Sequence, residues 1–340
     1  MKVARYYGAG DIRIEEMPVP LAGPGEMVIR IRASGICGSD VMHWYRRGRG
    51  PVVLGHEIGG EVSAVGEGVT AFKTGDRVSA SHHVPCNTCH YCRKGHETVC
   101  DTLRSTNFYP GGLCEYVQLP SINVDRGVYL LPESMSFEDA TFIEPLACVY
   151  RGQRIAGTDS YRSVLVIGSG ISGLLHVQLA RALGASLIVA TDISKYRLSA
   201  ARRLGADELI DATDDVPMTF RNINKGRPAD IVIVTTGAER AIIQALQSVD
   251  RGGTILFFAP AGKGVSVSLP VNDLFWRNEI TLTSSYAANY SEHMISMELI
   301  RQGKVNVREM VTHRLPLEET AEGFRLVERA EESLKVIITP

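Results

Sequence analysis

The sequence predicts an α/β protein with two domains, one β-rich and one built on a parallel sheet. Three observations lead to this fold class. The chain has 340 residues, enough for about two domains. Its first 130 residues contain short runs of Val and Ile that Gly and Pro interrupt. From about Tyr161 onward, strand-like runs alternate with helical segments, which is typical of a parallel sheet covered by helices.

Composition excludes several classes of protein. Lys plus Arg number 36 and Asp plus Glu 38, giving a net charge of −2, and 44% of the residues are hydrophobic. These values exclude a strongly basic nucleic-acid binder, a polybasic membrane-surface protein and an acidic disordered chain. The N-terminal segment lacks the apolar core of a secretory signal, and no run is apolar enough to span a bilayer. We therefore expect a cytoplasmic protein with a small-molecule substrate and neither nucleic-acid nor membrane partners.

The first part of the chain is expected to form short strands. Their Val- and Ile-rich runs are separated by turn segments such as Pro20–Gly25 and Gly48–Pro51. The predicted strands are Met27–Ile31, Glu61–Val65, Arg77–Ala80 and Cys114–Leu119.

The second part is expected to alternate strands and helices. Its helices have apolar residues at helical spacing, over Ile171–Leu183, Lys195–Leu204 and Arg240–Val249. The predicted strands are Ser163–Ile167, Leu187–Thr191, Glu208–Ile210, Asp230–Val234, Thr254–Phe258 and Ile280–Ser284. The tail then carries two helices, near Glu292–Arg301 and Leu317–Ala330, and a last strand at Leu334–Ile338. We expect this tail to rejoin the first domain.

A glycine-rich turn follows the strand Ser163–Ile167 and opens a helix. It reads Gly168-Ser169-Gly170-Ile171-Ser172-Gly173, which matches the dinucleotide-binding pattern G-x-G-x-x-G in its required strand–turn–helix context. The first glycine allows the tight turn, the second lets a pyrophosphate approach the backbone, and the third allows close packing of helix and strand. The helix N-terminus supplies N–H donors to the phosphates. The sequence therefore predicts a Rossmann domain.

Asp192 ends the next strand, near the spacing of about 20 residues expected for the acid that binds the cofactor ribose. Its carboxylate would accept hydrogen bonds from the ribose hydroxyls and repel a 2′-phosphate. This favours NAD over NADP, although Lys195 and Arg197 follow closely and weaken the preference. Arg197 and Thr236 complete the predicted cofactor site.

Four of the seven cysteines lie within fifteen residues, at Cys86, Cys89, Cys92 and Cys100. Without an export signal, such clustering indicates metal rather than disulfides. Four thiolates form a closed tetrahedral site, so we predict a structural zinc that orders this loop. A zinc-ribbon module for nucleic acid is the alternative. We expect the nearby His82, His83, His90 and His96 on the surface, because the thiolates already complete the zinc shell.

Two further motifs carry a resemblance to a known family. Cys37-Gly38-Ser39-Asp40 follows a strand-like run, and from Gly55 to Val69 the chain reads GHEIGGEVSAVGEGV, with GDRV from Gly75 to Val78. This resembles the zinc signature of the medium-chain alcohol dehydrogenases. The four-cysteine lobe, Glu144-Pro145-Leu146 and the glycine turn follow in that family's order. The resemblance covers essentially the whole chain and is nearest to the polyol (sorbitol- or galactitol-type) and threonine dehydrogenases.

The resemblance implies a domain organisation. Residues 1–152 and 289–340 would form a GroES-like catalytic domain with the zinc lobe at 82–102, and residues 153–288 the Rossmann domain.

The resemblance also implies a catalytic zinc bound by Cys37 and His56. Glu144 stands where alcohol dehydrogenases carry a third ligand, and Glu57 would ligate directly or through water. Thiolate, imidazole and carboxylate with an open position are typical of a catalytic zinc site. Asp40 is expected to hold His56 and fix its tautomer. Ser39 would take the proton of the substrate hydroxyl.

The sequence departs from the family pattern at two places. Many of these alcohol dehydrogenases have His five residues after the zinc cysteine, where this chain has Met42, with His43 next. His43 is therefore either the proton relay or a surface residue. Sorbitol dehydrogenases carry a polyol-binding Arg after the last nucleotide-domain strand, where this chain has Ser284–Ala288 without Arg. Sorbitol itself is thus in doubt as a substrate.

The leading hypothesis is a zinc- and NAD-dependent dehydrogenase that oxidises a secondary hydroxyl of a polyol, cyclitol or related molecule to a ketone. L-threonine or another 3-hydroxy amino acid is the alternative substrate. A zinc-free enone reductase and a non-catalytic NAD-binding sensor are the other hypotheses. We also expect a homodimer or homotetramer, because the apolar strand Ile280–Ser284 has the character of a sheet edge that pairs across a two-fold axis.

Overall fold

The structure is a computed structural model and describes residues 1–48 and 50–340. The chain folds into two compact units. The first comprises Met1–Ala147, Ala287–Gln302 and Val307–Pro340, and the second Cys148–Tyr286 with Gly303–Asn306. Most of the tail thus belongs to the first unit. No helix within the described residues is long and apolar enough to cross a membrane.

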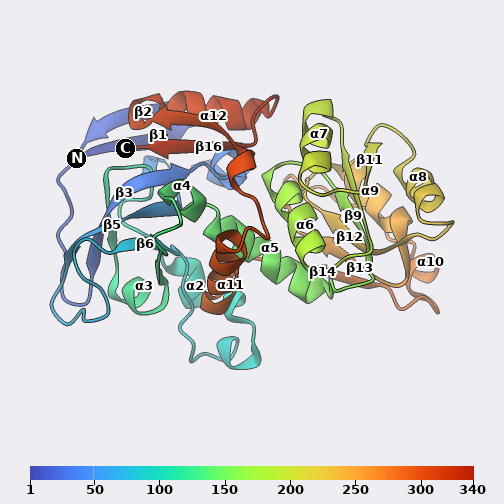
Figure 1. Ribbon diagram of the computed structural model, residues 1–340, viewed down its shortest axis with the longest axis horizontal. Helices are drawn as coiled ribbons and strands as arrows, with labels where there is room; N and C mark the ends of the chain where they lie inside the picture. The colour runs from blue at the N-terminus through green and yellow to red at the C-terminus, as the bar shows by residue number, and fades with distance from the viewer. Residues whose placement is uncertain (49) are drawn as a thin grey trace. The chain divides into compact units, whose positions relative to one another are not determined.

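The first unit is β-rich. Its main sheet has seven strands in the order β15-β16-β3-β5-β6-β8, with β7 paired to residues 27–30 of β3. Figure 1 shows β16, β3, β5 and β6 of this sheet. Tail strands β15 and β16 extend the sheet beside β3, so residues from both ends of the chain share it. The bounds are β3 Met27–Gly35, β5 Glu57–Val65, β6 Arg77–Ala80, β7 Tyr116–Leu119, β8 Val128–Leu130, β15 Val311–Pro316 and β16 Lys335–Thr339.

The strands of the first unit differ in several places from the predicted ones: β3 extends to Gly35, for example, and β7 begins at Tyr116. Strand β5 begins at Glu57 rather than Glu61, because two glycines at positions 59 and 60 leave room for neighbouring backbone and side chains. The N-terminus also forms a separate three-stranded sheet, of order β2-β1-β4, which the sequence did not indicate. Its strands are β1 Lys2–Gly8, β2 Asp11–Glu16 and β4 Val52–Val53.

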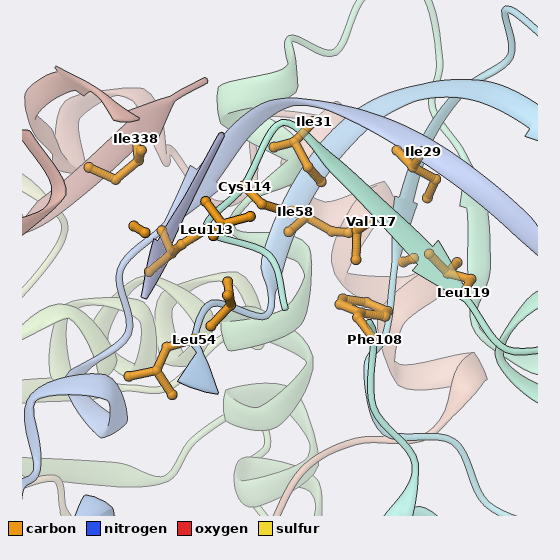
Figure 2. Close-up of a cluster of buried hydrophobic side chains, with 14 of the residues drawn as sticks. Ile29, Ile31, Leu54, Ile58, Phe108, Leu113, Cys114, Val117, Leu119 and Ile338 are labelled. Carbon is orange, nitrogen blue, oxygen red and sulfur yellow. The ribbon is translucent and has the colours of Figure 1, made fainter. Parts of the chain in front are cut away.

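The core of the first unit lies under β3, β5 and β7. Alternate residues of β3, such as Ile29 and Ile31, meet Ile58 of β5 and Val117 of β7 (Figure 2). Burying such side chains is the main stabilising contribution to a domain of this size. Cys114 is fully buried in this cluster, so it is a core residue.

Short helices connect these strands, and two longer ones come from the tail. Helix α12 packs against β16 (Figure 1). Helix α5 starts in the first unit and ends in the second. The helices with residues in this unit are α1 His43–Arg46, α2 Asp101–Ser105, α3 Ser121–Arg126, α4 Phe137–Ala140, α5 Ile143–Ala156, α11 Tyr290–Arg301 and α12 Thr320–Arg329.

The second unit is a doubly wound α/β fold, which confirms the predicted fold class. Its sheet is parallel throughout and has the order β11-β10-β9-β12-β13-β14. Numbered within the unit, this is 3-2-1-4-5-6, the order of dinucleotide-binding domains, with the strand order reversing between β9 and β12. The strands are β9 Ser163–Ile167, β10 Leu187–Asp192, β11 Glu208–Asp211, β12 Ala229–Val234, β13 Val249–Phe257 and β14 Thr281–Ser284.

Helices cover the sheet of the second unit in two groups. Helices α6 and α7 contact each other, and α8 contacts α9 on the other side of the strands (Figure 1). Every residue of β9 is buried, as expected for a central strand covered on both faces. The helices are α6 Ile171–Ala182, α7 Lys195–Arg203, α8 Val216–Ile223, α9 Glu239–Ser248 and α10 Val271–Phe275.

Candidate functional site

Cys37 is held by a capping loop at the end of β3. It is the N-cap of a short 3-10 turn, Gly38–Val41, and its backbone N–H donates to Asp40 Oδ2 at 3.1 Å. The N–H of Ser39 points at Cys37 Sγ, 3.5 Å away. A thiolate at this position thus faces an N–H donor, an arrangement that favours a metal ligand. Because Ser39 belongs to the turn that Cys37 caps, it lies beside the sulfur of Cys37.

Asp40 has a different role from the one predicted. It is fully buried, and its Oδ1 accepts a hydrogen bond from Arg46 at 2.9 Å. The distance from Asp40 Oδ1 to His56 Nδ1 is 3.9 Å, too long for a hydrogen bond. The expectation that Asp40 fixes the tautomer of His56 is therefore wrong in this structure. Asp40 instead links the Cys37 loop to Arg46, because its Oδ2 accepts a hydrogen bond from the N–H of Cys37 and its Oδ1 accepts one from Arg46.

Cys37, His56 and Glu57 form a group whose ligand atoms all lie within 4.8 Å of one another. Burial lowers the pKa of His56, while a hydrogen bond with Cys37 and the negative charges of Cys37, Asp40 and Glu144 raise it well above 6.5. Such an excess of negative charge around a buried imidazole is suited to a divalent cation. Sulfur, nitrogen and oxygen donors together match the ligand set of a catalytic zinc.

Glu144 and His43 lie outside that three-residue group. Glu144 opens helix α5 and is close enough to His56 to influence its pKa. The side chain of His43 is exposed, and its Nε2 lies 2.6 Å from Glu328 Oε1 on helix α12. The structure therefore places His43 in a surface ion pair. Of the two alternatives that the sequence left open, this agrees with a surface residue and not with a proton relay.

Glu57 is paired with a residue that sequence reasoning missed. Its carboxylate bonds to the ammonium group of Lys335, the first residue of β16, and each side chain is only 1% exposed. Lys335 Nζ also donates to the carbonyl of Ile36 at 3.3 Å, next to Cys37. No local signal marks this contact, because the partners are 278 residues apart.

His82 and His83 are not the plain surface residues that the sequence suggested. The His82 ring lies 4.6 Å from the His56 ring and 3.8 Å from that of His83. Burial, together with the neighbouring His56, lowers the pKa of His82 well below 6.5. His83 Nδ1 is 2.8 Å from the carbonyl of Thr106. Of the four histidines near the lobe, His90 and His96 are exposed, as predicted.

The four cysteines of the lobe come together as the sequence predicts. Cys86 Sγ lies 4.0 Å from Cys92 Sγ and 3.6 Å from Cys100 Sγ, and Cys89 Sγ is 3.6 Å from Cys92 Sγ. Four thiolates around a tetrahedral zinc, with Zn–S near 2.3 Å, lie about 3.8 Å apart. These spacings fit zinc and are much too long for disulfides.

Local donors also prepare the lobe for metal. The hydroxyl and N–H of Thr88, with the N–H of Cys89, point at Cys86 Sγ and lower the pKa of that thiol to about 5. Cys86 is therefore a thiolate at neutral pH, the form that binds zinc.

The three glycines of the turn after β9 have the geometry that a bound dinucleotide needs. Gly168 has φ of +97°. No atom lies within 4 Å of a Cβ built on Gly170, whereas one on Gly173 would overlap the carbonyl oxygen of Gly168. The second position is thus open for a pyrophosphate, and the third allows α6 to pack closely on the strand. Ile171 and Ser172 form the first turn of α6, whose N-terminus faces the glycine turn.

Asp192 is held at the end of β10 beside this turn. Its Oδ2 accepts from the N–H of Ser169 at 2.8 Å, and its Oδ1 from the N–H of Ser194 at 2.9 Å. Arg197 Nη1 is 3.9 Å from the same carboxylate. The acid is therefore fixed in place.

At the end of β12, Thr235 ties the ends of β9 and β12 together. The hydroxyl of Thr235 donates to the carbonyl of Gly168 at 2.8 Å. Thr236 also lies beside the turn, because its Cβ is 3.5 Å from a Cβ built on Gly168.

A glycine turn of the dinucleotide type in one unit, and a group of thiol, imidazole and carboxylate in the other, define a metal-dependent dehydrogenase. Residues 23–129 match the family model of the alcohol dehydrogenase GroES-like domain, and residues 172–301 that of the zinc-binding dehydrogenases. The chain is 34% identical to a sorbitol dehydrogenase of Gallus gallus, over 95% of this chain and 92% of that protein.

Two solved structures are also similar. A 2R,3R-butanediol dehydrogenase from Bacillus subtilis is 27% identical, with a TM-score of 0.88 over 100% of this chain and 99% of that one. A zinc-binding dehydrogenase from Sinorhizobium meliloti bound to NADP is 26% identical, with a TM-score of 0.89 and the same coverage. The chain belongs to the zinc-dependent medium-chain alcohol dehydrogenase family and is an alcohol or polyol oxidoreductase.

The first prediction concerns the lobe. Replacing one of its four thiols, as in Cys89→Ser, should cost the protein one equivalent of zinc and expose residues 86–100 to protease, because the lobe has little apolar content of its own. Metal analysis and limited proteolysis measure both effects. Cys114→Ser is the matched control, since this thiol is buried in the core and bonds only to backbone carbonyls. Full zinc content in Cys89→Ser would contradict the assignment.

The second prediction concerns the buried ion pair. Lys335→Met leaves the Glu57 carboxylate buried without a counter-charge, so the free energy of unfolding should fall by about 3–5 kcal/mol. Lys335→Met combined with Glu57→Gln should recover much of this loss. Arg314→Met, which removes an exposed ion pair with Glu138, should cost less than about 1 kcal/mol. Denaturation of the metal-free protein measures all three variants, and equal losses for Lys335→Met and Arg314→Met would argue against the pair's importance.

Proposed function

We propose that this enzyme uses NAD to oxidise a secondary hydroxyl of a small polyhydroxylated molecule, a polyol or cyclitol, with zinc bound by Cys37 and His56. The observation that carries the proposal is the close group of Cys37, His56 and Glu57, which offers three different donors. A zinc ion held there would act as a Lewis acid toward the substrate hydroxyl. A zinc-free reductase would have no need of these three groups.

Around the metal, the residues of the chain divide the remaining tasks. Glu57, buried with Lys335, adds a carboxylate as ligand or neighbour of the metal, and Glu144 supplies a second negative charge near His56. Ser39, next to Cys37, is the candidate acceptor of the hydroxyl proton. We do not assign the onward relay to His43, because its ring bonds to Glu328.

The two compact units are proposed to divide the work between them. The first would be the GroES-like catalytic domain and the second the cofactor domain. Asp192 supports a preference for NAD, since a fixed, nearly buried carboxylate beside the glycine turn repels a 2′-phosphate. Arg197 partly offsets that charge. The Sinorhizobium relative binds NADP, so the preference needs a direct test.

The test is an assay of NADH formation with polyols, cyclitols, secondary alcohols and L-threonine. We expect the highest kcat/KM with a polyol or cyclitol, and a higher kcat/KM for NAD than for NADP. Cys37→Ser should lower kcat/KM more than about a hundredfold, because Lewis acid catalysis contributes several kcal/mol. It should also lose one zinc equivalent, whereas Cys114→Ser should retain both.

Three results would contradict the proposal. Wild-type activity that survives complete zinc removal would exclude the metal mechanism. A preference for L-threonine would exclude the polyol substrate class. Equal kcat/KM for both cofactors would exclude the role given to Asp192.

We also propose that the enzyme is a homodimer or homotetramer. Strand β14 is the edge of the six-stranded sheet, and a second copy can extend that sheet across a two-fold axis. Exposed apolar side chains precede it, including Val271 and Trp276. Sedimentation should find an oligomer at micromolar concentration, and a stable monomer would contradict the proposal.

A further inference from the structure

Two imidazoles near the metal group each have a buried ring nitrogen without a hydrogen-bond partner. His82 follows strand β6, and its Nδ1 is buried and unpaired. His293 lies in helix α11, is 2% exposed, and has an unpaired, buried Nε2. His293 is near enough to contribute to the lowered pKa of His82. Unpaired polar atoms in a protein interior are unfavourable and rare, so they call for an explanation.

The ring of His293 is held by a hydrogen bond and a stack, and the ring of His82 packs between two other imidazoles. The carbonyl of His82 accepts from Asn123 Nδ2 at 3.0 Å, and its ring is flanked by those of His56 and His83. His293 Nδ1 lies 2.8 Å from the carbonyl of Asn289, and its ring stacks on Tyr129 with centroids 5.1 Å apart and planes 8° apart. In these positions neither buried nitrogen has a hydrogen-bond partner among the described residues.

The bond to Asn289 determines what His293 can bind. A carbonyl only accepts, so Nδ1 carries the proton. Burial lowers the pKa of His293 to about 4, so the ring is neutral at pH 7 and its Nε2 is an acceptor. An acceptor needs a donor such as a hydroxyl, and it repels a carboxylate. A hydroxyl also suits His82 Nδ1, because a hydroxyl both donates and accepts.

We propose that His82 and His293 form a second hydroxyl-binding subsite beside the metal, which binds a substrate hydroxyl that is not oxidised. The substrate class is thereby narrowed to vicinal diols and polyols, as opposed to monohydric alcohols and substrates that would present a carboxylate here. This inference rests on the proposed function and deepens it.

An unpaired nitrogen alone does not make such a site. His176, in helix α6 of the second unit, also has an unpaired, buried Nε2, but it packs edge-on against Phe258 and beside Gln153. It has no second histidine and no metal ligand as a neighbour among the ring contacts of the described residues. His176 therefore provides a matched control for substitution of a buried histidine.

The experiment compares 2,3-butanediol with 2-butanol, which share a carbon skeleton and differ by one hydroxyl. For each variant of the zinc-loaded enzyme, the ratio of kcat/KM for the diol to that for the monol is measured. His293→Asn keeps an amide N–H where Nδ1 donates to Asn289 but has no atom at Nε2. His82→Phe keeps the ring against His56 but removes both nitrogens. Each should lower the ratio about tenfold or more.

Two further variants serve as controls. His293→Gln places an amide near the Nε2 position and should restore part of the diol preference that His293→Asn loses. His176→Asn makes the same substitution at the control histidine and should leave the ratio at its wild-type value.

A ratio that is unchanged in both His293→Asn and His82→Phe would overturn the subsite, and so would a ratio that falls equally in His176→Asn. Failure of the proposed function is a separate result, in which wild-type enzyme oxidises neither alcohol. The subsite is then judged by equilibrium binding of the two alcohols to the enzyme–NADH complex, followed by NADH fluorescence. Equal affinity of the wild type for the diol and the monol would overturn it.

Discussion

The buried ion pair between Glu57 and Lys335 joins the two ends of the first unit at the metal group. Glu57 begins β5 directly after His56, and Lys335 begins β16, almost at the C-terminus. A buried charge is tolerated only when it is paired, so each residue requires the other. The tail must therefore cross back to the first sheet, where β16 lies beside β3. Through Ile36, Lys335 also touches the strand end that carries Cys37.

Around this pair, the protein prepares its donors before metal binds. The N–H of Ser39 faces the Cys37 thiol, and the hydroxyl of Thr88 faces the Cys86 thiol. In both places, backbone or hydroxyl donors stabilise a thiolate, which is the form that binds zinc. The two zinc groups then differ in their remaining ligands. Four thiolates close the lobe, whereas imidazole and carboxylate beside a single thiolate allow an open position for substrate.

In the second unit, hydrogen bonds likewise fix the cofactor-binding turn before the cofactor binds. Thr235 bridges the ends of β9 and β12, where the strand order reverses. Asp192 holds Ser169 within the glycine turn. Hydrogen bonds from neighbouring strands thus fix the loop before a dinucleotide arrives, which lowers the entropy cost of binding.

The sequence by itself determined the features whose chemistry depends on local spacing. The four cysteines within fifteen residues, the glycine turn after a buried strand and the alternation of strands and helices each follow from a few neighbouring residues. Tertiary structure alone decided the rest. It paired Glu57 with Lys335, turned Asp40 toward Arg46 instead of His56, and brought His82 and His293 close to each other. Apart from the short-range contact of Asp40 with Arg46, these contacts join residues that are far apart in the sequence. Local spacing cannot encode them, because packing and the pairing of buried charges select such partners only once the whole sheet has formed.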